Sequence, residues 1–274
     1  MAMDTIQLTR PGLFVTGTDT GVGKTAVACG IAAVLRQQAL GASVGVCKPF
    51  ATGCRRERGT LVAEDAEALA HFADCRLPLE TVCPIRHRLP MSPAAAAEAE
   101  GMPIDWGALA SALLQLDQAS DLMVIEGVGG LMVPLDPAMP RYTVRDLAMA
   151  LGYPVIVVAR SGLGTLNHTA MTIALLQHAG LNIAGIVMNG YEPDEAIAMS
   201  DDPSRPSNRN WLRRLTGVEV VATVPRIKEK DMRPHEGVMH DEVLASLAVV
   251  DWSRILRPPG QKAVGPVPRR RHLT

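Results

Sequence analysis

Six short apolar runs rich in β-branched residues alternate along the chain with longer amphipathic stretches. Runs that are apolar at every position are typical of strands buried on both faces, and the longer stretches have the spacing of helices. This alternation predicts an α/β fold with a predominantly parallel sheet and helices on both faces. The predicted strands are Leu13–Thr16, Val44–Lys48, Leu122–Glu126, Val155–Ala159, Ile183–Met188 and Val218–Val224. The predicted helices are about Lys24–Leu40, Glu64–Phe72, Ala94–Glu100, Trp106–Ala119, Thr143–Leu151, Gly164–Ala179 and Asn208–Thr216.

The chain has 274 residues, and α/β folds of about 200–250 residues commonly form one domain. We therefore predict a single domain over residues 1–256. From about Arg257 the composition changes to Pro, Gly and Arg, which predicts a mobile tail over residues 257–274. Glu192–Ser207 is rich in Pro, Asp and Ser and is predicted to be a surface loop.

Composition argues against several classes of partner. The net charge is −1, the pI is near 6.7 and aromatic residues make up 3% of the chain, so neither a basic field nor stacking rings favour nucleic acid. The apolar runs fall well short of the ~20 residues that span a bilayer. The N-terminus lacks the apolar core of a signal peptide, and the five cysteines include no C-x-x-C pair. We expect a cytoplasmic protein with no nucleic-acid or membrane partner.

Gly17–Thr25, with the sequence GTDTGVGKT, directly follows the first predicted strand and opens a predicted helix. A phosphate-binding P-loop requires this context, because main-chain N–H groups of the turn and of the helix N-terminus converge on phosphate oxygens. Lys24 is expected to reach the β- and γ-phosphates, and the Thr25 hydroxyl to bind Mg²⁺. The standard pattern has its first glycine at position 18, where this chain has Thr18. Together with the alternation, the motif predicts a P-loop NTPase-type fold.

Charged residues stand where two predicted strands end. Glu126 ends the run LMVIE and Lys48 ends the second strand, and carboxyl ends of parallel strands face the ligand crevice of α/β sheets. Glu126 and Asp65 are candidate Mg²⁺ ligands. Lys48 is a candidate for neutralising a transferring phosphoryl group, and Thr52 offers a hydroxyl on the same loop. The alternatives are a solvent-facing strand end for Glu126, a dipole-stabilising position in a first helical turn for Asp65, and an ordinary surface lysine for Lys48.

These motifs, taken in order, resemble the dethiobiotin synthetase family, including the displaced first glycine. The resemblance extends over roughly Leu13–Asp231. Its motifs are Phe14–Thr20, Val22–Thr25, Lys48-Pro49, Thr52-Gly53, Ser92-Pro93, Glu126-Gly127, Gly129-Gly130, Pro134-Leu135, Leu163-Gly164, Asn167-His168, His178–Leu181 and Asn189.

The resemblance implies an ATP- and Mg²⁺-dependent carbon–nitrogen ligase of biotin biosynthesis. Its substrates would be 7,8-diaminopelargonate, CO₂ or bicarbonate, and ATP. One amine takes up CO₂ to form a carbamate, ATP phosphorylates the carbamate, and the second amine closes the ureido ring of dethiobiotin with loss of phosphate. Such a reaction depends chiefly on positioning and on offsetting charge between two anions.

The resemblance also implies a role for individual residues. Lys48 would be the catalytic lysine near the carbamate, Lys24 and Thr20 would act at the phosphates, and Thr52 would contact the substrate. Thr25, Asp65 and Glu126 would bind Mg²⁺. The nucleotide site would comprise Gly21, Val22, Gly23, Lys24, Thr25, Asp65, Glu126, Gly127, Val128 and Gly129, with Asn189 at the adenine, Val224, Pro225 and Arg226 beside it, and Glu229 near the ribose.

Family members are dimeric, so the resemblance implies a homodimer. The loop Leu163–Asn167, through Gly164, Thr165 and Asn167, would bind the substrate carboxylate across the interface. Three positions depart from the family. Ala94 replaces a frequent His, while Gly21 and Gly190 each replace an acidic residue, so contacts at these positions are expected to differ.

Two other functions fit a P-loop. An amidating synthase of the cobyrinate type needs a glutamine-hydrolysing domain with a nucleophilic Cys, and no cysteine follows Cys83. A nucleotide-dependent switch or partitioning ATPase carries a lysine five residues before the P-loop lysine, where this chain has Asp19. Dependence of ATP hydrolysis on the diamino acid, or instead on DNA or a protein partner, would separate enzyme from switch.

Overall fold

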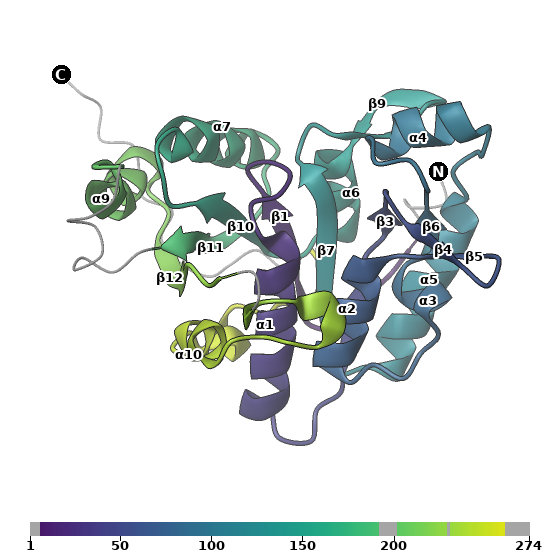
Figure 1. Cartoon of the computed structure of the whole chain (residues 1–274), viewed down its shortest axis with the longest axis horizontal. Helices are drawn as coiled ribbons and strands as arrows, with labels where there is room; N and C mark the ends of the chain where they lie inside the picture. The colour runs from purple at the N-terminus through teal and green to yellow at the C-terminus, as the bar shows by residue number, and fades with distance from the viewer. Residues whose placement is uncertain (1–5, 192–201, 229–230, 261–274) are drawn as a thin grey trace.

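The computed structural model describes residues 6–191, 202–228 and 231–260. Its centre is a six-stranded sheet in the order β12-β11-β10-β1-β7-β2, in which every neighbouring pair is parallel (Figure 1). The strands are β1 (Gly12–Gly17), β2 (Val44–Cys47), β7 (Leu122–Gly130), β10 (Val155–Arg160), β11 (Ile183–Tyr191) and β12 (Val220–Pro225). All six predicted strands and the predicted parallel α/β class are therefore confirmed.

Helices cover both faces of this sheet, because alternate side chains of each strand enter two separate cores. Leu13 and Val15 of β1 pack into one core and Phe14 between them packs into the other. The first core is closed by α1 (Lys24–Gln38), α2 (Glu64–Ala73) and α10 (Asp241–Ala248). The second is closed by α5 (Trp106–Ala119), α6 (Val144–Leu151), α7 (Thr165–His178) and α9 (Arg205–Thr216).

Local sequence signals start several of these helices. The Asp105 side chain caps α5 by accepting a hydrogen bond from the Ala108 N–H at 2.8 Å. Thr143 and Asp146 form a capping box at the start of α6. Ser92, followed by Pro93 in the first turn, caps the short α4 (Pro93–Glu100). These caps explain why the predicted starts of α4, α5 and α6 lie within one residue of the observed ones.

The structure also contains short elements that the sequence did not predict. Three pairs of short strands lie outside the main sheet: β3 (Phe50–Ala51) with β6 (Ile85–Arg86), β4 (Arg55–Glu57) with β5 (Thr60–Val62), and β8 (Pro134–Asp136) with β9 (Met139–Thr143). Among the described residues, the remaining unpredicted elements are α3 (Leu79–Val82), α10, and the 3₁₀ turns η3 (Pro234–Glu236) and η4 (Trp252–Arg254).

Two irregular segments are more ordered than predicted. Residues 205–207 of the predicted surface loop form the first turn of α9, where Pro206 is well placed, and residues 192–201 lie outside the described part of the chain. Arg257 of the predicted mobile tail forms an isolated bridge with Gly12, and the Gly260 N–H donates to the Gly152 carbonyl at 3.0 Å. Residues 261–274 are not among those described. Within the described ranges, no helix combines the length and apolar character needed to cross a membrane.

Candidate active site

The candidate site lies along the carboxyl edge of the sheet. The phosphate loop follows β1, Lys48 follows β2, Glu126 lies within β7 and Asn189 within β11. Because all six strands are parallel, these positions share one edge, where α/β sheets bind their ligands. Residues that are far apart in sequence therefore meet around the phosphate loop.

The phosphate loop is shaped by two glycines in the left-handed region. Gly21 has φ +69° and Gly23, directly before α1, has φ +91°, conformations that favour glycine. The Lys24 ammonium folds back along the loop and donates to the Asp19 carbonyl at 3.0 Å. Burial, reinforced by the Lys48 charge, lowers the pKa of Lys24 to about 8. Lys24 is therefore a desolvated cation beside the turn that would hold phosphate.

Next to this loop, Lys48, Asp65, Glu126 and Thr25 form one connected cluster. The Lys48 ammonium lies 2.6 Å from Glu126 Oε1 and 2.8 Å from Asp65 Oδ2. The Thr25 hydroxyl lies 2.8 Å from the same Glu126 oxygen and 2.9 Å from Asp65 Oδ1. The structure thus brings together all three residues that we predict to bind Mg²⁺, together with the predicted catalytic lysine.

Burial sets the charge balance of this cluster. Glu126 is fully buried, which raises its pKa, and its Oε2 has no hydrogen-bond partner among the described residues. Burial alone would lower the pKa of Lys48, but Glu126 and Asp65 more than offset that effect and hold it above its ordinary value. Lys48 is 3% exposed, so it is not an ordinary surface lysine, and Glu126 does not face solvent. Asp65 is partly exposed, and Lys48 holds its pKa below the usual range despite the opposing effect of burial.

The donor set of the cluster fits a hard divalent cation. Two carboxylates and one hydroxyl supply only oxygen ligands, and the buried Glu126 Oε2 lacks a partner. No group of three or more His, Cys, Asp and Glu side chains within the described ranges is suited to hold a metal. Phosphate oxygens and water would complete the coordination that Mg²⁺ prefers.

The glycines after Glu126 continue β7 past the phosphate loop. Gly130 pairs with Gly17, and a Cβ on Gly129 would stand 3.4 Å from the Thr20 hydroxyl and 2.7 Å from a Val133 methyl. Gly127 contributes its carbonyl, which accepts from Lys48 Nζ at 3.3 Å. The run Gly127–Gly130, including Val128, is therefore strand rather than turn, and its small residues allow the two backbones to approach.

The predicted adenine residues lie at the other end of the same edge. The Asn189 amide donates to the Val22 carbonyl at 2.9 Å, which ties β11 to the phosphate loop. Val224 and Pro225 end β12, and the Arg226 N–H donates to the Tyr191 carbonyl at 2.9 Å. Glu229 lies outside the described residues.

The predicted substrate-carboxylate loop already holds a carboxylate of the chain itself. The Leu163 N–H donates to Asp202 Oδ2 at 2.8 Å. The Thr165 hydroxyl is buried and lies 3.3 Å from that of Thr169, whereas Gly164 and Asn167 are exposed. Of the three predicted residues, only Gly164 and Asn167 are thus open to a ligand without rearrangement. Thr20 is also exposed, and Thr52 is partly exposed on the loop that follows β3.

Arg160 is a site residue that sequence reasoning missed. It ends β10, and its guanidinium donates to the Thr20 carbonyl of the phosphate loop at 3.1 Å. The sequence does contain a signal for Arg160, because this charged residue ends an apolar run just as Glu126 ends the run LMVIE.

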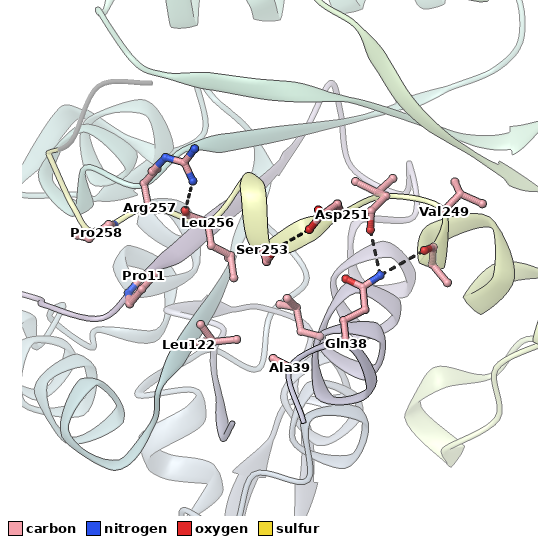
Figure 2. Close-up of a pocket in the computed structure, with 13 residues that line it drawn as sticks. Pro11, Gln38, Ala39, Leu122, Val249, Asp251, Ser253, Leu256, Arg257 and Pro258 are labelled. Atoms are coloured by element: carbon pink, nitrogen blue, oxygen red, sulfur yellow. Dashed lines mark hydrogen bonds between the residues drawn. The ribbon is translucent and has the colours of Figure 1, made fainter. Parts of the chain in front are cut away.

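A cavity of about 660 Å³ lies near the opposite, amino edge of the sheet, and no predicted site residue lines it (Figure 2). Pro11 and Leu122, beside the starts of β1 and β7, contribute to its wall. Gln38 bonds to the carbonyls of Ala248 and Val250 at 3.2 and 3.0 Å, so this prominent polar group is already paired.

Comparisons with known proteins identify the family to which the chain belongs. A family model described as an AAA domain matches residues 11–232. The chain is 45% identical to the ATP-dependent dethiobiotin synthetase BioD of Anaeromyxobacter sp. (strain K) over 214 residues, which cover 78% of this chain and 89% of that protein. It is 35% identical to the protein of the same name from Bacillus subtilis (strain 168), over 79% of this chain and 87% of the relative.

Solved structures show the fold alone. The apo McdA of Cyanthece gives a TM-score of 0.50 at 12% identity, covering 88% of this chain and all of that one. The MinC:MinD cell division protein complex of Aquifex aeolicus gives a TM-score of 0.50 at 12% identity, covering 87% of this chain and 94% of that one.

Fold and phosphate loop together define a P-loop nucleotide-binding protein. Within that class, its similarity to the curated relatives shows that the chain belongs to the dethiobiotin synthetase family.

Proposed function

We propose that this chain is an ATP-dependent ligase that closes the ureido ring of dethiobiotin. The substrates are 7,8-diaminopelargonate, CO₂ or bicarbonate, and ATP, and the other products are ADP and phosphate. The observation that carries the proposal is the 45% identity to a relative named for this activity, over 89% of that relative. The lysine–carboxylate cluster beside the phosphate loop supplies groups suited to the chemistry.

The reaction forms two carbon–nitrogen bonds. One amine adds to CO₂ and loses a proton, which gives a carbamate. A carbamate oxygen then attacks the γ-phosphorus of ATP, and the bond from that phosphorus to ADP breaks. The second amine attacks the carbamoyl carbon, the carbon–oxygen bond to phosphate breaks, and the ring closes with loss of a proton.

Two lysines offset the charge that builds in the phosphoryl transfer. Lys24, beside the loop that would hold phosphate, pairs with the β- and γ-phosphates, and Lys48 faces the carbamate from the end of β2. Thr20 and Thr52 provide hydroxyls at the reacting groups. Because the carbamate and the triphosphate are both anions, holding them together is the main work of the site.

We assign Thr25, Asp65 and Glu126 to Mg²⁺. These residues would hold the metal beside the phosphate loop, where its charge would offset part of the negative charge of the phosphates. The fully buried Glu126, with one unpartnered oxygen, supports this assignment. Asn189, Val224, Pro225 and Arg226 are assigned to the adenine end, with Glu229 near the ribose.

We further propose a cytoplasmic homodimer. The five cysteines are free thiols, which fits a reducing compartment. Gly164 and Asn167 lie at the exposed start of α7, where a partner subunit could present the substrate carboxylate. The mass of the protein in solution, measured by light scattering, tests the dimer directly.

Phosphate release from Mg²⁺-ATP and bicarbonate, measured with and without 7,8-diaminopelargonate, tests the activity, with dethiobiotin identified by mass. We expect release to depend on the diamine. Lys48→Met should lower turnover at least about a hundredfold. The control Arg36→Met removes an exposed charge near the far end of α1 and should leave turnover unchanged. Diamine-independent release without the ureido product would contradict the proposal.

A further inference from the structure

A metal ion that binds Asp65 and Glu126 must compete with the Lys48 ammonium, which contacts both carboxylates. We propose that the Lys48 ammonium is a built-in placeholder for the divalent cation, holding the two carboxylates in the empty enzyme and leaving them when the metal binds. The inference rests on the metal assignment in the proposed function. It adds a second state for Lys48 and makes metal binding the event that frees the lysine for the reacting carbamate.

The contacts of the cluster carry the first step. Glu126 Oε1 accepts from both Lys48 and Thr25, and the two oxygens of Asp65 are divided between the same two donors. The ammonium and the hydroxyl thus engage both Asp65 oxygens and Glu126 Oε1, and only Glu126 Oε2 has no partner among the described residues. Mg²⁺ requires ligands at about 2.0–2.1 Å in near-octahedral geometry. Both Asp65 oxygens already accept a hydrogen bond or contact the ammonium, so coordination by Asp65 must take an oxygen that Thr25 or Lys48 now engages.

Charge makes the two cations alternatives. Glu126 is fully buried and Lys48 is 3% exposed, so water screens the contact between these two side chains weakly. Without any cation, two adjacent carboxylates would repel each other in a desolvated site. With both cations on the same oxygens, a monovalent and a divalent charge would repel each other at close range. The carboxylates are therefore most stable when either the ammonium or the metal ion, and not both, contacts the same oxygens.

The structure also provides a place for the released ammonium. The Lys48 main chain is held by the hydrogen bond from its N–H to the Val82 carbonyl at 2.8 Å and by the following Pro49. Movement is therefore restricted to side-chain rotamers. Lys48 Nζ already lies 3.3 Å from the Gly127 carbonyl, which remains as an acceptor when the carboxylates turn to the metal. That carbonyl lies in the strand segment that passes the phosphate loop.

Binding of Mn²⁺ to the nucleotide-free protein, measured by electron paramagnetic resonance, tests the placeholder without any turnover. Lys48→Met keeps most of the side-chain volume but removes the competing cation, and should tighten Mn²⁺ binding at least about tenfold. Lys24→Met is the charge-matched control, because Lys24 also bears a nearby charge but donates to the Asp19 carbonyl instead. It should tighten binding by no more than about threefold.

Equal effects of the two substitutions would overturn the placeholder, since they would reflect removal of one positive charge alone. If Mn²⁺ binds to none of the three proteins, even with ADP present, the assignment of Thr25, Asp65 and Glu126 to a metal is itself overturned. Both outcomes are read from Mn²⁺ binding alone, so they do not depend on whether the variants form dethiobiotin.

If Lys48→Met does not fold, a crystal structure of the wild-type protein tests the proposal instead. A crystal structure with ADP and Mn²⁺, the metal located by its anomalous signal, should show Mn²⁺ at Thr25, Asp65 and Glu126. Lys48 Nζ should then lie beyond hydrogen-bond distance, about 3.5 Å, from both carboxylates. An ammonium that still bridges Asp65 and Glu126 beside the bound metal would overturn the proposal.

Discussion

The side-chain amide of Asn189 reaches across the width of one strand to donate to the main-chain carbonyl of Val22. Asn189 lies on β11 and Val22 lies in the loop after β1, and β10 runs between these two strands. Gly23 follows Val22, and a Cβ there would collide with the Asn189 amide. The conformation of the phosphate loop is therefore coupled to a residue near the opposite end of the site.

Gly23→Ala is expected to destabilise the protein by more than about 2 kcal/mol. The φ of +91° disfavours any L side chain by about 1–2 kcal/mol, and the collision with Asn189 adds to that cost. Urea unfolding measures the change in free energy. In an Asn189→Ala background the collision disappears, so the same substitution should cost only the conformational part. Equal costs in both backgrounds would show that the collision contributes nothing.

Glu126→Gln should raise the Mg²⁺ concentration that supports half-maximal turnover by about tenfold or more, because the amide keeps the shape of the side chain but loses its charge. Turnover at saturating ATP, titrated with Mg²⁺, gives the measurement. Glu57→Gln removes an exposed carboxylate on β4 and serves as the control. An unchanged Mg²⁺ requirement in Glu126→Gln would exclude Glu126 from the metal site.

Asp202 should make stability depend on acid pH. Hydrogen bonds from the Ser204 hydroxyl and the Leu163 N–H lower the pKa of Asp202 from 3.8 to about 2. A carboxyl whose pKa is lower in the folded state stabilises the fold above its unfolded pKa, and this contribution is lost as the pH falls through the folded pKa. The difference in stability between wild type and Asp202→Asn should therefore be constant above about pH 4 and shrink towards about pH 2. A difference that does not change with pH over this range would contradict the assignment.

Trp106→Phe should destabilise the protein by about 1–3 kcal/mol. The indole N–H donates to Asp136 Oδ2 at 2.7 Å, and the ring packs edge-on against Phe50 and Tyr142. Phenylalanine keeps a ring but leaves the buried carboxylate without this donor. Trp211→Phe, at a ring that is 48% exposed, should cost less than about 1 kcal/mol. Thermal or urea unfolding of both variants distinguishes the two positions.

Periodicity was sufficient for the main elements of the fold. Runs such as Val155–Ala159 are apolar at each position because both faces of the strand are buried, and such runs can be recognised in the sequence. The short pairs such as β4 with β5 are exposed and only a few residues long, so they leave no periodic signal. Helix α10 was missed for a different reason, since its N-cap is His240 rather than the Ser, Thr, Asp or Asn that commonly marks the start of a helix.

The candidate site was partly predictable. Strand ends and the glycine-rich loop indicated Lys24, Lys48 and Glu126 individually. Their mutual contacts were not predictable, because Lys48 and Glu126 are 78 residues apart and their pairing depends on β2 and β7 being neighbours in the sheet. The bond from Leu163 to Asp202 is likewise a contact between distant segments with no local motif.

The sheet order has a consequence for synthesis on the ribosome. Strand β7 inserts between β1 and β2, which were made earlier, so the central sheet cannot close in the order in which its strands emerge. Thr25 and Lys48 are made well before Glu126, which contacts both of them in the folded protein. Nascent chains shorter than about the end of β7 therefore expose unpaired strand edges and lack the acidic partner of Lys48, so they are candidates for chaperone protection rather than for early ligand binding.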